Sequence, residues 1–135
     1  MGLRFEFDAE NKILLGKFEG RLSDESLVES YQAIRKYSVA TDARAGILDF
    51  SLVTEISATS DMIRNLARQD PAMPDAVHRP RVLVAPATHL FGIARMFQIV
   101  GERKRPRLTV VRTLDEAFAA LGVKSPHFEP LALSP

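Results

Sequence analysis

The apolar residues of this chain change their spacing repeatedly, and the changes mark the borders of predicted elements. Between residues 81 and 121 the continuous apolar run RVLVA is followed by THLFGIARMFQIV, in which apolar residues recur at helical spacing. RLTVV is strand-like again, and TLDEAFAAL opens with a capping box. Short apolar runs favour buried strands, whereas a 3.6-residue period and a capped start favour helices. This stretch therefore predicts a strand, a helix, a strand and a helix.

The first half of the chain predicts a hairpin, a helix, a short strand and a second helix. Residues 4–8 alternate between charged and aromatic side chains, and residues 13–18 form a second strand-like run after a turn. Ser23 is placed to cap a helix that carries apolar residues on one face. A short strand follows at residues 46–50, and the helix after it ends before Pro71, because proline lacks the amide proton.

Helices that alternate with short apolar strands favour a parallel sheet with right-handed crossovers. The predicted fold is therefore α/β, with a mixed sheet of about five strands, an N-terminal antiparallel hairpin and about four helices. A chain of 135 residues has the size of one domain. We assign the domain to residues 1–124 and the Pro-rich segment 125–135 to a C-terminal tail.

Composition excludes several classes of function. The net charge of +1, from 18 basic and 17 acidic residues, gives no overall field toward nucleic acid or anionic membranes. The absence of cysteine excludes disulfides, thiol catalysis and Cys-ligated metal. The three histidines, His78, His89 and His127, lack the spacing of a metal site. We predict neither a metal nor a cofactor.

The predicted localisation of the protein rests on two features, its charged N-terminus and the length of its apolar runs. The charged N-terminus does not fit a signal peptide, and no apolar run approaches the roughly 18 residues of a membrane span. We expect a cytoplasmic protein without a transmembrane segment.

Polar side chains gather at one edge of the predicted sheet. The carboxyl ends of parallel strands share an edge, where helix N-termini offer free amides to anions. The candidates for ligand binding there are Asp49, Ser51, Ser57, Thr59, Thr88 and His89. The alternative is that the serines and threonines of this set only cap helices. As an alternative function, a small enzyme would use His89 to shuttle protons. Its partner would be Asp49, Ser51 or Thr88.

The opposite edge of the predicted sheet gathers positive charge. We call the following residues the basic rim: Arg79, Arg81, Arg103, Lys104, Arg105 and Arg107. Such a rim suits an acidic partner, a phosphate or a nucleic acid. Cations near a helix C-terminus also satisfy the helix dipole, and no aromatic residues interleave with these. We therefore favour a solvated or partner-facing rim and expect no DNA binding.

The predicted helix at residues 90–100 is apolar on most of its circumference. A single sheet buries only one face of a helix, so the remaining apolar surface of this helix must be buried by something else. Three alternatives follow, namely a homodimer contact, the C-terminal tail folded over the helix, or an apolar ligand cavity.

The segment 81–122 resembles the C-terminal half of the SpoIIAA-like proteins, a branch of the STAS fold also labelled STAS/SEC14-like. The likeness lies in FGIARMF at 91–97 and LDEAF at 114–118. Upstream, GILDFS at 46–51 is similar to that family's central Asp-bearing strand. Together these segments cover about two-thirds of the chain, mostly as packing patterns.

The resemblance implies a small, non-enzymatic module for regulation or ligand binding that often self-associates. It implies a homodimer, with a protein partner or a small apolar or anionic ligand. Anti-sigma-factor antagonists of the broader fold carry Asp-Ser-Ser-Gly after the central strand, with the first serine phosphorylated. The matching residues here are Ser57, Ala58, Thr59 and Ser60. Ala58 at the acceptor's place argues against the same switch, although Thr59 or Ser57 would serve as a displaced acceptor.

Overall fold

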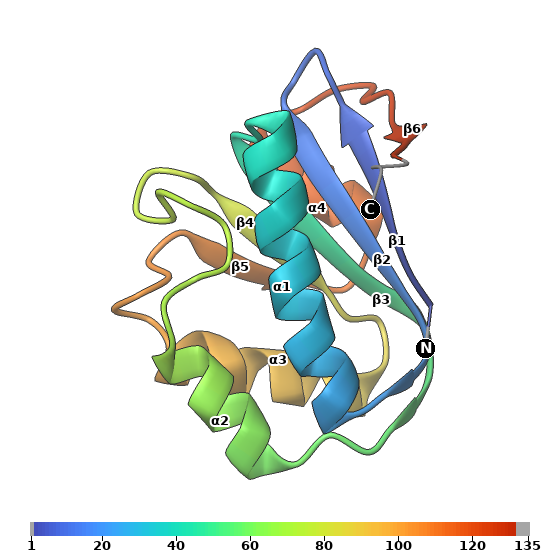
Figure 1. Ribbon diagram of the computed structural model, residues 1–135. Helices are drawn as coiled ribbons and strands as arrows, with labels where there is room; N and C mark the ends of the chain where they lie inside the picture. Colours follow the sequence, from blue (N-terminus) through green and yellow to red (C-terminus); the bar gives the residue numbers. More distant parts are fainter. Residues whose placement is uncertain (1, 132–135) are drawn as a thin grey trace.

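The computed structural model describes residues 2–131, and these form an α/β structure with four helices and a six-stranded mixed sheet (Figure 1). In chain order the elements are β1 (Gly2–Asp8), β2 (Ile13–Leu22), α1 (Asp24–Thr41), β3 (Ala45–Ile56), α2 (Ser60–Arg68), β4 (Arg81–Val84), α3 (Thr88–Val100), β5 (Leu108–Val111), α4 (Leu114–Leu121) and β6 (Glu129–Pro130). The predicted fold class is confirmed.

The sheet has the strand order β5-β4-β3-β2-β1-β6. β1 pairs antiparallel with β2, as the predicted hairpin requires, and β2 to β5 are parallel. β6 pairs antiparallel with the outer side of β1. The tail therefore adds an edge strand that the apolar pattern does not predict, because a two-residue strand has no periodicity to detect.

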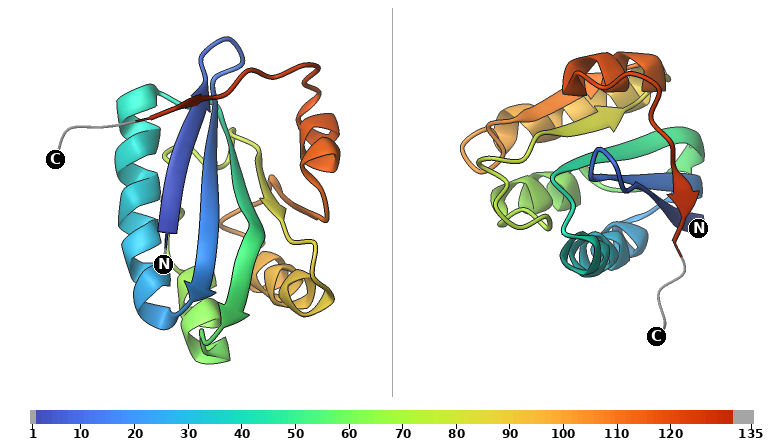
Figure 2. Two further views of the ribbon diagram at one scale, coloured as in Figure 1. Left: turned by 90° about the vertical axis from the view of Figure 1, so that its right-hand side faces the viewer. Right: turned by 90° about the horizontal axis from the view of Figure 1, so that it is seen from above.

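Side-chain alternation along the strands divides the core into two layers. Ile13 and Leu15 of β2 pack toward α4, in a cluster with Ala117. Leu14 and Phe18 point to the other face, where α1, α2 and α3 lie. Figure 2 shows α1 and α4 on opposite sides of the sheet. Right-handed crossovers between successive parallel strands place the first three helices on one face.

β3 is longer than the predicted strand at residues 46–50. It runs to Ile56, because Leu52 to Ile56 pair with β2 beyond the point where β4 ends. The backbone of β2 supplies the hydrogen-bond partners of this segment, and Val53, Thr54 and Ile56 are residue types that favour strands. Asp49 and Ser51 consequently lie within β3 and not at its end, which corrects the predicted edge position.

Within the described residues, the C-terminal tail does not cover α3. This excludes one of the three alternatives that were predicted to cover the apolar surface of that helix. Phe128 stacks on Phe118 of α4, with ring centroids 6.0 Å apart. The amide of His127 donates to the buried carboxylate of Asp8 at 3.3 Å. Residues 132–135 of the predicted tail lie outside the described part of the chain.

Candidate ligand site

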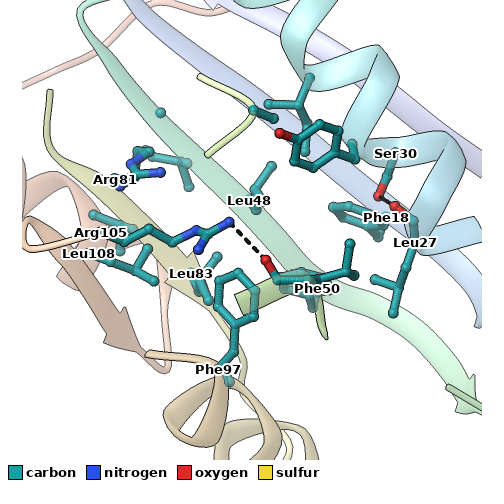
Figure 3. Close-up of a pocket in the computed structure, with 18 of the residues that line it drawn as sticks. Phe18, Leu27, Ser30, Leu48, Phe50, Arg81, Leu83, Phe97, Arg105 and Leu108 are labelled. Carbon is teal, nitrogen blue, oxygen red and sulfur yellow. Dashed lines mark hydrogen bonds between the residues drawn. The ribbon is translucent and has the colours of Figure 1, made fainter. Parts of the chain in front are cut away.

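An apolar cavity of about 160 Å³ lies between the sheet and helices α1, α2 and α3 (Figure 3). Side chains from all four sides line it, including Phe18, Leu27, Leu48, Ile63, Phe97 and Leu108. The surplus apolar surface of α3 thus has a cover on its inner side, since Leu90, Ile93, Ala94 and Phe97 all face the cavity. Ile99 on the same helix is 63% exposed.

Arg105 enters this apolar layer from the loop between α3 and β5. Its side chain is only 5% exposed. Nη1 donates to the carbonyl of Ala67 at 2.7 Å and Nη2 to the carbonyl of Leu66 at 3.1 Å. The guanidinium also lies 4.8 Å from the centroid of the Phe97 ring. Because carbonyls in the last turn of a helix lack intrahelical partners, Arg105 completes the C-terminal end of α2.

Arg81 is the second cation of the cavity, and its side chain projects from the first residue of β4. Its Nε and Nη2 atoms are shielded from solvent and have no hydrogen-bond acceptor among the described residues. Burial, followed by repulsion from Arg105, lowers the pKa of Arg81 to about 10. Arg81 is therefore still charged at neutral pH.

The predicted basic rim is not a row of six solvent-facing cations. Arg81 and Arg105 both line the cavity, where their aliphatic stems lie among apolar side chains. The terminal nitrogens of Arg105 also donate to carbonyls of α2 there. The outward orientation of these two arginines was predicted wrongly.

Of the remaining rim residues, three are tied to neighbouring loops. Arg79 pairs with Asp42 at 3.7 Å and Lys104 with Asp70 at 2.8 Å. Arg107 donates to the carbonyl of His78 at 2.8 Å. Arg103 is exposed.

The candidates at the carboxyl edge form separate local contacts. Asp49 is buried, and its Oδ1 accepts from the amide and the hydroxyl of Ser51. Ser57 accepts from Nε of Arg21 at 3.0 Å. Ser57 does not cap α2, because Thr59 is the N-cap of that helix.

Thr59 is the N-cap of α2, as predicted for one of the serines and threonines. Its Oγ1 accepts from the amide of Met62 at 3.1 Å. Thr59 also contacts Asp24 in the first turn of α1, since its amide donates to Oδ1 at 2.7 Å and its hydroxyl to Oδ2 at 3.1 Å. Asp24 thereby links the N-termini of α1 and α2.

Thr88 does not cap α3, because Ala87 is the residue with extended backbone before the helix and Thr88 is already helical. Thr88 and His89 are both exposed. Among the described residues, no hydrogen bond joins His89 to Asp49, Ser51 or Thr88. Of these four described residues, hydrogen bonds join only Asp49 and Ser51 to each other.

Sequence reasoning named an apolar cavity only as one of three covers for α3 and did not place Arg81 in it, although two signals pointed to this site. The apolar surplus of α3 was one of them. The other was Arg81 beside Val82 and Leu83, because alternation along a strand places Arg81 and Leu83 on the same face. Both residues line the cavity.

Comparison with known proteins identifies the fold. No protein-family model matches the sequence, and no curated protein is significantly similar to it. Among solved structures, the chain is similar to the phosphorylated form of SpoIIAA, a Bacillus cell fate determinant. The two chains are 18% identical with a TM-score of 0.52, and the match covers 87% of this chain and 97% of the Bacillus chain. The protein therefore has the SpoIIAA-like STAS fold, as the sequence resemblance predicted.

Within residues 2–131, no helix combines the length and the apolar character needed to cross a bilayer.

Proposed function

We propose that this protein is a non-enzymatic, cytoplasmic STAS-fold module that binds a small, largely apolar ligand between the sheet and helices α1–α3. The observation that carries the proposal is the cavity of about 160 Å³ with its apolar lining. Cavities of about 150 Å³ with such linings accept benzene. Sites for drug-sized molecules begin at roughly 300 Å³, so the ligand is smaller than these.

The polar residues at the carboxyl edge support a binding role over catalysis. Asp49 and Ser51 bond to each other, and His89 lies exposed without a bond to either. General acid–base catalysis requires such groups within hydrogen-bond reach around one substrate. This arrangement favours a module that recognises a ligand without transforming it.

Control by a ligand also suits this chain better than control by phosphorylation. Ala58 stands where the acceptor serine is expected, and the neighbouring Thr59 hydroxyl already contacts Met62 and Asp24. A phosphoryl group on Thr59 would face the Asp24 carboxylate, and like charges repel.

The proposal includes self-association through the outer side of α3. Ile99 on that side is 63% exposed, and Met96, one helical turn earlier, is partly exposed, so the two form an apolar strip of the kind found at contact surfaces. Light scattering of the purified protein and of Ile99→Glu tests this part. We expect a dimer that the substitution converts to a monomer, and a monomeric wild type would contradict it.

Fluorobenzene, followed by ¹⁹F NMR, is a suitable neutral probe for the cavity. We expect saturable binding to the wild-type protein. Ala94 is buried and lines the cavity, so Ala94→Leu should fill part of the space and weaken binding at least about tenfold. Ala119→Leu on the exposed side of α4 is the matched control and should bind like the wild type. Fluorobenzene that does not bind, or that binds Ala94→Leu unchanged, would contradict the proposal.

A further inference from the structure

We infer that Arg81 is the anion-binding residue of this cavity and that the ligand is a small carboxylate whose apolar body fills the remaining space. The inference rests on the proposed function and names the chemistry of its ligand. It follows from the arrangement of donors, charges and apolar surface around the cavity.

The unused donors of Arg81 have the geometry of a carboxylate partner. Nε and Nη2 lie on the same edge of the planar guanidinium, and both are shielded from solvent without an acceptor in the described chain. Two parallel N–H groups on that edge match the two oxygens of a carboxylate in a bidentate pair. A buried polar group of this kind calls for a partner, because its desolvation is otherwise uncompensated.

Arg105 differs from Arg81 in that its terminal nitrogens already have partners. Nη1 and Nη2 donate to the carbonyls of Ala67 and Leu66. Arg105 therefore holds α2 in place and contributes positive charge, whereas Nε and Nη2 of Arg81 have no acceptor in the described chain and would meet a ligand once the side chains that cover them move aside.

Among the described residues, neither guanidinium has an ion-pair partner, and the longer-range attraction of Asp70 favours the charge of Arg105. None of their ion pairs within 4.0 Å includes Arg81 or Arg105. The nearby acid Asp70 bonds to Lys104. Two cations in an apolar layer disfavour each other and favour an anion between or beside them.

The cavity also fixes how such a ligand would lie. Figure 3 shows Arg81 and Arg105 at one side of the cavity, and Phe18 and Leu27 at the opposite side. A carboxylate on Arg81 would thus direct its apolar body toward Phe18 and Leu27. The volume suits a single ring or a short branched chain.

A carboxylate fits this set of donors better than a phosphate ester does. The free edge of Arg81 offers two donors to two oxygens. A phosphate group presents three oxygens and a charge near −2, and Arg105 already uses one N–H of each terminal nitrogen on a helix carbonyl.

Three aromatic probes with the same ring test the inference by ¹⁹F NMR and calorimetry. They are 4-fluorobenzoate, the neutral fluorobenzene and 4-fluorophenyl phosphate. We expect the wild-type protein to bind 4-fluorobenzoate at least about tenfold more tightly than fluorobenzene, because a bidentate ion pair adds to the same apolar contact. The phosphate ester should bind more weakly than the benzoate.

Substitutions at Arg81 identify the residue responsible. Arg81→Met keeps the apolar stem and should abolish the preference for 4-fluorobenzoate while retaining fluorobenzene binding. Arg81→Lys keeps the charge without the two-donor edge and should lose most of the preference. Arg103→Met removes an exposed arginine of the basic rim and should bind all three probes like the wild type.

Other outcomes separate this inference from the proposed function. Fluorobenzene binding without a preference for 4-fluorobenzoate overturns the inference and leaves the apolar site. A preference that persists in Arg81→Met places the anion elsewhere, and tighter binding of 4-fluorophenyl phosphate rejects the carboxylate. Failure of all three probes overturns both proposals. Arg81→Met should fold, because apolar residues often replace buried charges without loss of stability. If Arg81→Met does not fold, the loss of preference for 4-fluorobenzoate in Arg81→Lys tests the inference instead.

Discussion

Nη1 of Arg105 lies 2.7 Å from the carbonyl oxygen of Ala67, a residue 38 positions earlier in the chain. This contact joins the loop after α3 to the C-terminal end of α2. Gly101 lies beside it, since a Cβ atom at that position would come within 2.8 Å of the Ala67 carbonyl oxygen and 3.1 Å of Arg105 Nη1. The contact therefore depends on a residue without a side chain at the end of α3.

Gly101→Ala should destabilise the protein. The added methyl group would meet the backbone of Ala67, so the Arg105 contact has to shift, at an expected cost of about 1–3 kcal/mol for overpacking. Urea denaturation measures the change. Gly92→Ala within α3 is the control, because a Cβ there meets nothing within 4 Å, and it should stabilise by about 0.5–1 kcal/mol. Equal stabilities of the two variants would refute this account.

Thr59→Ala should lower the free energy of unfolding by about 1 kcal/mol through loss of the α2 N-cap. Asp24→Ala should also lower the free energy of unfolding. The double variant should lose less than the sum of the two single losses, because both side chains belong to one contact. Denaturant titration of the four proteins gives the coupling. Ser60→Ala, exposed at the first position of the helix, should be nearly neutral. Strict additivity of Thr59→Ala and Asp24→Ala would count against the described link.

Asp8 should make the protein sensitive to acid. Burial raises the pKa of this carboxyl, but hydrogen bonds from Asn11, His127 and Glu10 outweigh burial and hold the pKa below 3.8. A lowered folded-state pKa contributes stability above the unfolded value, and that stability disappears as pH falls through the folded value. Thermal melts should therefore show declining stability below about pH 4.

Asp8→Asn provides the comparison for the acid effect. It should be less stable than the wild type at pH 7 and should lose less stability between neutral and acid pH. Asp61→Asn, which changes an exposed carboxylate, should retain the wild-type slope. A wild-type slope in Asp8→Asn would show that other carboxylates cause the acid sensitivity.

Phe128→Ala should destabilise the domain even though the residue lies in the predicted tail. Phe128 stacks on Phe118 and packs on the cluster beneath α4, so truncation should cost about 1–3 kcal/mol. His127→Ala beside it removes an exposed side chain but keeps the backbone bond to Asp8 and should be close to neutral. Denaturation midpoints of the two variants decide whether the tail belongs to the folded unit.

The parts of the fold that sequence predicted are those that short segments determine. The period changes between residues 81 and 121 located β4, α3, β5 and α4, because each element carries its own pattern of burial. The outer half of β3 was missed because Ser51 and Glu55 interrupt its apolar run, although Val53, Thr54 and Ile56 favour a strand.

The site was harder to predict because its key contacts join distant segments. Arginine is rarely buried, so Arg105 was expected on the surface. Its burial depends on the carbonyls of Leu66 and Ala67, which no local pattern connects to it. The apolar pattern of α3 suggested a cavity, but the place of Arg81 in it became clear only once the helices were placed over the sheet.

The nine residues of α2 are held at both ends by side chains from other elements. Asp24 of α1 holds Thr59 at its start, and Arg105 holds the last carbonyls. Ile63 and Leu66 of this helix face the cavity. Any displacement of α2 that opens the cavity would break polar contacts at one end or the other. A molecule that entered or left by displacing α2 would have to break these contacts, so its residence time would depend on them as well as on its affinity.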